Sequence, residues 1–167
     1  MGVIYGIISQ LRGGEGVQRG RRKMLKKVKP GDSLPVIEKE IDQDRILRWA
    51  KISGDFNRLH VDPEYARQTR FGGTIAHGPM SLAFLNELMM ECFGMGWASG
   101  GKLLDVRFVA PIRPGDKIRV SGTVKQVQII GGKWSVECDL AVEKQNGEKA
   151  VSGRALANAE FGMQNAE

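Results

Sequence analysis

A short polar segment in the first half of the chain carries the residue types best suited to proton transfer. Asp55 and His60 lie in it, and the other of the chain's two histidines, His77, follows. On a continuous helix, a spacing of five residues would separate two side chains by roughly 140°, too far to share a site. Gly54 and Asn57 favour a broken loop instead, in which a carboxylate and an imidazole can meet and exchange protons near neutral pH.

The other reactive residue types indicate no metal or redox chemistry. Cys92 and Cys138 lie far apart and match no metal-binding or redox spacing. Asp55, His60 and His77 match no common metal-site spacing either. We therefore expect neither a metal nor a cofactor. The cysteines are interpreted as small buried residues of a protein in a reducing compartment, the cytoplasm.

A long apolar helix is predicted directly after His77. It begins at Gly78-Pro79 and ends near Phe93. Proline suits the first position of a helix, because an N–H group there would have no partner within the helix. Because apolar residues cover most of its circumference, the rest of the fold must enclose this helix. At about 15 residues it is too short to span a bilayer.

Strands are predicted for most of the remaining chain. Four of them follow the apolar helix in sequence, and Asn146-Gly147 is a favoured hairpin turn between two of these. Four consecutive strands after one buried helix predict an antiparallel meander wrapped around that helix, an α+β layout. The predicted elements are a strand over 34–41, a helix capped by Asp42 and ending near 52, an irregular loop over 53–61, helical turns over 63–69, and strands over 103–109, 116–129, 133–143 and 149–161.

The net charge of +6 comes from one end of the chain. Residues 1–29 contain eight basic side chains and a single acid, Glu15, which leaves 17 basic and 18 acidic residues for a nearly neutral remainder. We expect a disordered, glycine-rich basic extension over 1–29 and one domain over 30–167. The extension has no interleaved aromatic residues, and no apolar stretch is long enough for a bilayer. Neither nucleic acid nor a membrane is therefore expected as a partner.

The segment around Asp55 resembles the signature of a known enzyme family. Gly54-Asp55-Phe56-Asn57, His60 and Asp62-Pro63 are similar to a motif of the MaoC-like, R-specific enoyl-CoA hydratases, also called hydratase 2. The later run FGGTIAHG over 71–78 also resembles that family, as do Phe108, Pro111 and Gly115-Asp116, in the same order. The resemblance implies the hot-dog fold, in which an antiparallel β-sheet wraps around a long central helix.

The resemblance also implies roles for three residues of the site. Asp55 and His60 match the family's catalytic pair, which holds and activates a water molecule. Gly78 matches a glycine whose N–H group binds the thioester oxygen. A helix N-terminus suits that task because its N–H groups have no partner within the helix.

Three supporting residues and two departures complete the resemblance. Asn57 matches an asparagine that braces the loop. For His77 a structural role at the helix entrance is favoured over a catalytic one, whereas Asn86 either contacts the site or bonds to its own backbone. Arg58 stands where the family usually has proline, and Trp49 where it has tyrosine or phenylalanine. The change at Arg58 predicts either a looser loop or a contact with a phosphate of the carrier.

The implied function is the hydration of a trans-2-enoyl-CoA to a (3R)-hydroxyacyl-CoA, or the reverse dehydration, by a homodimer. One alternative is a dehydratase for hydroxyacyl chains on acyl carrier protein or for branched dicarboxylyl-CoA compounds. Another is a non-catalytic subunit that binds acyl thioesters, which the presence of Asp55 and His60 disfavours. A thioesterase is compatible with the fold alone, but fold is a poor guide to reaction.

Overall fold

The computed structural model describes residues 28–131 and 133–159. The basic extension predicted over 1–29 lies almost wholly outside these residues, so its disorder and the domain boundary at residue 30 stay predictions. The end of the strand predicted over 149–161 lies outside them too. Within the described ranges, no helix is both long and apolar enough to cross a membrane.

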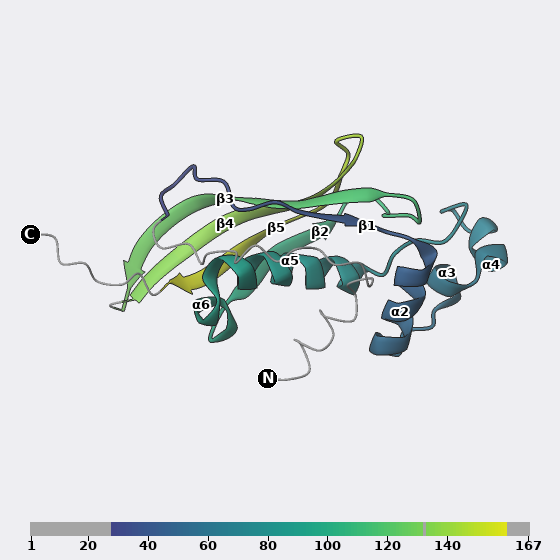
Figure 1. Cartoon of the computed structure of the whole chain (residues 1–167), viewed down its shortest axis with the longest axis horizontal. Coiled ribbons are helices and arrows are strands. Elements are labelled where there is room, and N and C mark those ends of the chain that lie inside the picture. The colour runs from purple at the N-terminus through teal and green to yellow at the C-terminus, as the bar shows by residue number, and fades with distance from the viewer. Residues whose placement is uncertain (1–27, 132, 160–167) are drawn as a thin grey trace, which may run out of the picture.

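Five strands form one curved antiparallel sheet (Figure 1). They are β1 (Ile37–Glu40), β2 (Lys102–Phe108), β3 (Lys117–Ile130), β4 (Lys133–Lys144) and β5 (Lys149–Ala159), and their order across the sheet is β1-β3-β4-β5-β2. β3, β4 and β5 follow one another as a meander with long pairings. Gly131 and Gly147, at the two turns between them, have positive φ angles of 57° and 82°, which glycine adopts readily.

The first strand after the long helix, β2, is not part of this meander, and in this respect the prediction is wrong. It pairs with β5 at the far edge of the sheet, where Phe108 lies opposite Val151. The neighbour of β3 is instead β1, with Ile37 opposite Val120. β1 and β4 occupy both sides of β3, so β2 cannot pair with it. β2 instead pairs with the free edge of β5, and the chain then crosses the sheet to β3.

The edge strand β2 is irregular in its middle. Its register against β5 shifts between Leu104 and Arg107, and Asp105 in this bulge has a φ of 50°, which is uncommon for a residue other than glycine. Arg154 of β5 holds the bulge in place. Its guanidinium donates hydrogen bonds to the Asp105 carboxylate at 3.0 Å and to Glu137 of β4 at 2.7 Å.

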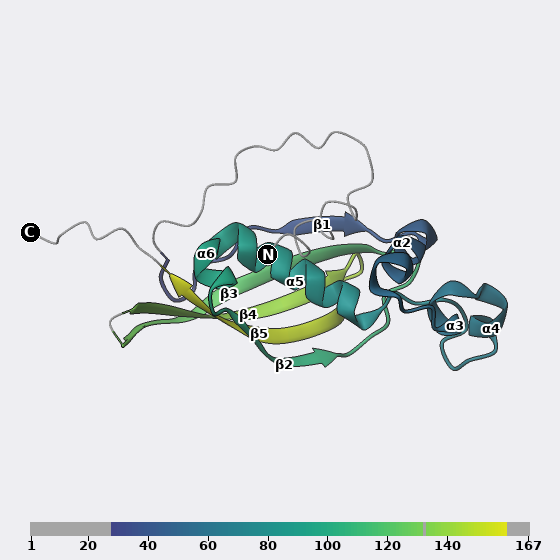
Figure 2. The ribbon, with the colours of Figure 1, turned by 90° about the horizontal axis from the view of Figure 1, so that it is seen from below.

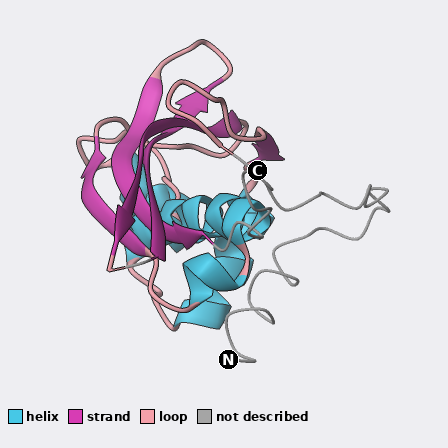
Figure 3. Ribbon diagram, turned by 90° about the vertical axis from the view of Figure 1, so that its left-hand side faces the viewer, coloured by secondary structure: helices cyan, strands magenta, loops and turns pink. Residues whose placement is uncertain are grey.

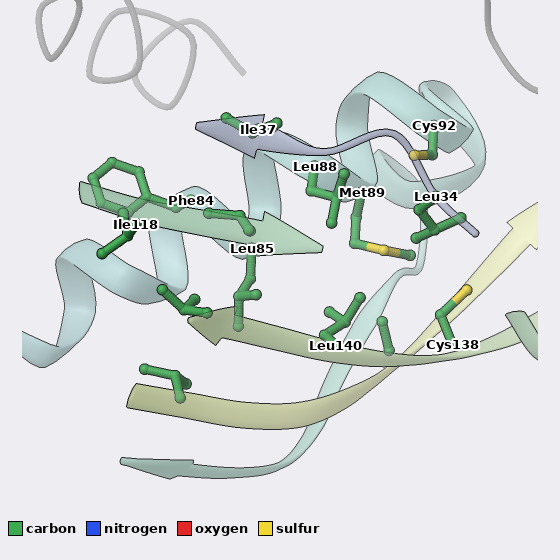
Figure 4. Packing of buried hydrophobic residues seen from close by; sticks show 14 of the residues in the cluster. Leu34, Ile37, Phe84, Leu85, Leu88, Met89, Cys92, Ile118, Cys138 and Leu140 are labelled. Atoms are coloured by element: carbon green, nitrogen blue, oxygen red, sulfur yellow. The ribbon is translucent and has the colours of Figure 1, made fainter. Parts of the chain in front are cut away.

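The long helix α5 (Gly78–Phe93) lies against the concave face of the sheet, which curls around it (Figure 3). Its buried side chains include Phe84, Leu85, Leu88 and Met89, and they pack in one cluster with strand residues such as Leu140 (Figure 4). Burial of one such side chain stabilises the fold by about 2 kcal/mol, so α5 contributes much of the core. The predicted α+β layout around an enclosed helix is confirmed.

A helix precedes the polar segment and positions it. Asp42 caps α2 (Gln43–Ser53) by accepting a hydrogen bond from the Arg45 N–H group at 2.6 Å. Gly54 ends α2 with a φ of 75°. The chain thereby turns into the loop that carries Asp55, at the end of the sheet where α5 begins (Figure 2).

The irregular loop predicted over 53–61 is wrong in its second half, which is helical. Asn57 caps α3 (Arg58–Val61) by accepting a hydrogen bond from the Leu59 N–H group at 3.0 Å. Asp62 caps α4 (Pro63–Arg67) in the same way through the Tyr65 N–H group. A single helical turn has too few residues to show a periodic pattern, and its caps stabilise it instead.

Candidate active site

The loop after α2 and the start of α5 meet at His77. The His77 Nε2–H group donates a hydrogen bond to the main-chain carbonyl oxygen of Asp55 at 2.9 Å. Oδ2 of the Asp55 carboxylate is 4.0 Å from the same nitrogen, which is too far for a hydrogen bond. Two segments that are separate in the sequence therefore lie together, and Asp55 stands beside the start of the central helix.

His60, on α3, completes the cluster. Its ring stacks on that of His77, with the centroids 3.8 Å apart and the planes inclined by 30°. Its Nδ1 atom lies 2.8 Å from the carbonyl oxygen of Ile75. Because a carbonyl oxygen can only accept a hydrogen bond, Nδ1 carries a hydrogen, and in the neutral ring the lone pair is then on Nε2. His60 can therefore accept a proton at Nε2.

His77 is better suited to support the site than to exchange protons. Its side chain is buried, and this burial lowers its pKa from the ordinary value of 6.5, although the hydrogen bond to the Asp55 carbonyl partly opposes the shift. Its Nδ1 atom has no hydrogen-bond partner among the described residues. The lowered pKa favours the neutral ring at pH 7, with its hydrogen on Nε2, and this fits the structural role favoured for His77.

Asn57 braces the loop through its own backbone and side chain. Its N–H group donates to Asp55 Oδ1 at 3.1 Å, and its side-chain oxygen caps α3 through Leu59. The loop is thus held despite Arg58, whose guanidinium pairs with Asp62 at 3.0 and 2.8 Å. The Asp55 side chain remains 48% exposed, so its carboxylate is accessible to a substrate.

Gly78 is the first residue of α5, and the helix has no side-chain cap. Its N–H group is among those that a helix leaves without an intrahelical partner, and the partial positive charge of the helix lies there. Phe108 lies directly over this glycine. A Cβ atom at Gly78 would be 3.2 Å from Phe108 Cε1, so the ring can lie this close only because the residue is glycine.

Asn86 does not join the cluster, although it was a candidate to support it. Its side-chain nitrogen donates to the Leu82 carbonyl oxygen at 2.8 Å, and its oxygen accepts a hydrogen bond from Trp97 Nε1 at 3.1 Å. Trp97 belongs to α6 (Met95–Ala98), a short helix that the sequence did not predict. Of the two alternatives for Asn86, the structure has the bond to its own backbone, and the side chain joins α5 to α6.

Two residues that the sequence did not single out are linked to His60 by hydrogen bonds, one directly and the other through the first. The Gln43 side-chain nitrogen donates to the His60 main-chain carbonyl oxygen at 2.9 Å. The Thr74 hydroxyl donates to the Gln43 side-chain oxygen at 2.6 Å. Thr74 lies in the FGGTIAHG run, but no local pattern connects it to Gln43, because their contact forms only in the folded chain.

The cluster has the composition of a possible metal site. The ligand atoms of Asp55, His60 and His77 all lie within 4.8 Å of one another. Two of the imidazole nitrogens, however, already donate to the main-chain carbonyl oxygens of Ile75 and Asp55. With one nitrogen of each ring donating, the neutral rings have one lone pair each, an arrangement that suits proton transfer. The absence of a metal stays our prediction.

Known proteins resemble this chain in sequence. The family model described as MaoC like domain matches residues 25–146. The 3-hydroxyacyl-thioester dehydratase Z of Mycobacterium tuberculosis is 37% identical over 113 residues, which make up 65% of this chain and 75% of the relative. The peroxisomal enoyl-CoA hydratase 2 of Arabidopsis thaliana is 28% identical over 104 residues, 62% of this chain and 33% of that longer protein.

The fold is also found in solved structures. The (R)-hydratase from A. caviae involved in PHA biosynthesis superposes with a TM-score of 0.68 at 23% sequence identity. The superposition covers 81% of this chain and 100% of the hydratase chain. The predicted hot-dog fold is thereby confirmed.

Proposed function

The chain belongs to the family of MaoC-like domains, and we propose that it catalyses the (R)-specific addition of water to a trans-2-enoyl-CoA, or the reverse dehydration of a (3R)-hydroxyacyl-CoA. The two relatives above bear the names of a dehydratase and a hydratase, the two directions of one reaction type. The observation that carries the proposal is that the side chains of Asp55 and His60 lie within 4.8 Å of one another beside the first residue of α5.

In the proposed hydration, water attacks the β-carbon while His60 Nε2 accepts one of its protons. The Asp55 carboxylate accepts a hydrogen bond from the same water and orients its lone pair. The imidazolium of His60 then gives its proton to the α-carbon, so that one hydroxyl and one hydrogen are added for each water consumed. Dehydration follows the same steps in reverse.

Negative charge develops on the thioester oxygen as water adds. We assign the stabilisation of this oxygen to the N–H group of Gly78 and to the partial positive charge at the start of α5. His77 and Asn57 support the pair, His77 by holding the Asp55 carbonyl and Asn57 by bracing the loop.

A homodimer in the cytoplasm is the form that we propose to be active. Phe56, Phe108 and Val109 are 58%, 56% and 63% exposed, and Phe108 lies against Gly78. A second subunit that covers such an apolar surface would complete an acyl pocket beside the site. Light scattering should therefore give twice the mass of the 18.4 kDa chain, and a stable monomer would contradict this part of the proposal. The two cysteines are buried thiols that form no disulfide, which fits a reducing compartment.

The test of the reaction uses crotonyl-CoA and longer enoyl thioesters on both CoA and acyl carrier protein. Loss of absorbance of the conjugated thioester measures hydration, and chiral chromatography identifies the (3R) product. Asp55→Asn and His60→Gln should each lower kcat/KM by about 10²–10⁴-fold. Asp139→Asn, an exposed carboxylate on β4 whose side chain lies 3.9 Å from Lys125, serves as the control and should keep full activity.

Three results would count against the proposal. A wild-type protein that hydrates none of these thioesters would exclude the reaction. Equal activity in wild type, Asp55→Asn and His60→Gln would exclude the assigned pair. Release of free thiol without hydration would indicate a thioesterase instead.

A further inference from the structure

A closed ring of hydrogen bonds joins three segments of the chain at His60. Gln43, the first residue of α2, donates to the His60 main-chain carbonyl oxygen at 2.9 Å. Thr74 donates from its hydroxyl to Gln43 Oε1 at 2.6 Å. The residue after Thr74 closes the ring, because the carbonyl oxygen of Ile75 lies 2.8 Å from His60 Nδ1. The ring thus holds both the main chain and the imidazole of one residue.

The chemistry of the partners allows one arrangement of donors and acceptors. The His60 carbonyl oxygen can only accept, so the amide nitrogen of Gln43 must face it, and the amide oxygen of Gln43 then faces the Thr74 hydroxyl. The Ile75 carbonyl oxygen can also only accept, which requires hydrogen on His60 Nδ1. Each link therefore agrees with the tautomer that leaves the lone pair on His60 Nε2.

The ring is anchored on two sides. Thr74 is 8% exposed, and the nearby Ala76 N–H group donates to the Ile112 carbonyl oxygen at 2.7 Å. On the other side, the Asp42 cap fixes the start of α2 next to Gln43. These hydrogen bonds are partly buried, and a group that loses its partner there is costly because water replaces that partner only in part.

We infer that Gln43 and Thr74 are positioning residues that fix the main chain, the ring orientation and the tautomer of His60. The inference rests on the function proposed above, in which His60 is the base. Gln43 acts on His60 directly, and Thr74 acts by fixing the orientation of the Gln43 amide. Neither residue has a part in the proton transfer itself.

Two substitutions on different segments open the ring. Thr74→Val removes the hydroxyl at nearly constant volume, and Gln43→Glu replaces the amide donor by a carboxylate that faces the His60 carbonyl. Thr74→Ser keeps the hydroxyl and is expected to keep function. Thr123→Val is the matched control, because Thr123 is exposed on β3 and outside the ring.

With crotonyl-CoA, Thr74→Val and Gln43→Glu should each lower kcat about 10-fold or more and change KM less than about twofold, because a misplaced base slows the chemical step. Thr74→Ser and Thr123→Val should match the wild type. A comparable fall of kcat in Thr123→Val, or an equal fall in Thr74→Ser and Thr74→Val, would assign the losses to general destabilisation and overturn the inference.

The tautomer of His60 gives a readout that does not depend on activity. Since the chain has two histidines, imidazole ¹⁵N NMR contains signals from two side chains, which the spectrum of His77→Gln assigns. The wild type should carry hydrogen on His60 Nδ1, and both ring-opening variants should shift the population toward the Nε2–H form by about 5-fold. An unchanged tautomer in both variants overturns the inference. A wild type that hydrates no thioester overturns the proposed function, while the tautomer still decides the positioning.

Discussion

The substitution Gly78→Ala, which adds a single methyl group, should lower the proposed catalytic activity without lowering the stability of the fold. A Cβ atom there would lie 3.2 Å from Phe108 Cε1 and 3.3 Å from Cζ, so the ring must move by a few tenths of an ångström. The Phe108 side chain is 56% exposed and can make that movement. Alanine is also the better helix former, by up to about 1 kcal/mol. The free energy of unfolding of Gly78→Ala should therefore stay within about 1 kcal/mol of the wild type.

In the proposed reaction the thioester oxygen binds the Gly78 N–H group, and the added methyl group would crowd that oxygen. Loss of one such donor interaction lowers kcat by about 10²–10³, which corresponds to about 2.7–4 kcal/mol. We expect Gly78→Ala to lower kcat/KM for crotonyl-CoA at least about 100-fold in the absorbance assay. Urea denaturation of the same preparation should show a midpoint close to that of the wild type.

Two controls separate this explanation from a displaced aromatic ring. In Gly73→Ala the new Cβ lies 3.9 Å from Arg113 Nη1, an ordinary contact, so the variant should keep its activity. Phe108→Leu, alone and combined with Gly78→Ala, removes the crowded ring but leaves the methyl group. Full recovery in the double variant, or wild-type kcat/KM in Gly78→Ala, would refute the assignment of the Gly78 N–H group to the thioester oxygen.

Three further substitutions test buried contacts at the site and elsewhere in the fold. Because burial lowers the pKa of His77, the unfolded chain binds more protons than the native state below about pH 6.5, and stability falls as the pH decreases. His77→Gln should flatten this loss in urea denaturation between about pH 7 and 5, and an unchanged slope would contradict a neutral buried ring. Lys39→Met should destabilise the protein by about 3 kcal/mol, because its ammonium group lies 2.7 Å from Glu87 and both side chains are buried. A loss below about 1 kcal/mol would place this pair among exposed ion pairs. Gly96→Ala should lower Tm by about 5–10 °C, since its Cβ would lie 1.9 Å from the Asn158 carbonyl oxygen; an unchanged Tm would contradict the contact of α6 with β5.

The parts of the fold that depend on neighbouring residues could be predicted from the sequence. The start of α5 at Gly78-Pro79 and the turn at Asn146-Gly147 are examples, since the residues that determine each lie side by side in the chain. The place of β2 could not be predicted in this way. Its pairing, with Phe108 opposite Val151, depends on which strand edges the rest of the sheet leaves free.

The candidate site shows the same division. Asp55 and His60 could be singled out because titratable residues among glycine and asparagine are informative on their own. The partner of Asn86 could not be, since it lies in a helix of one turn with no periodic signal. Gln43 and Thr74 are ordinary polar residues in sequence, and their relation to His60 arises only when three distant segments fold together.

The two outer strands limit how far the sheet can be extended by other chains. On one side, β1 has four residues, which offer a further strand too few hydrogen bonds for stable pairing. On the other side, the bulge of β2 at Asp105 accepts a partner only in a register that fits it. Both edges therefore restrict the addition of further strands. The ion pair of Arg154 with Asp105 holds this bulge and so helps to limit the pairing of further strands at this edge.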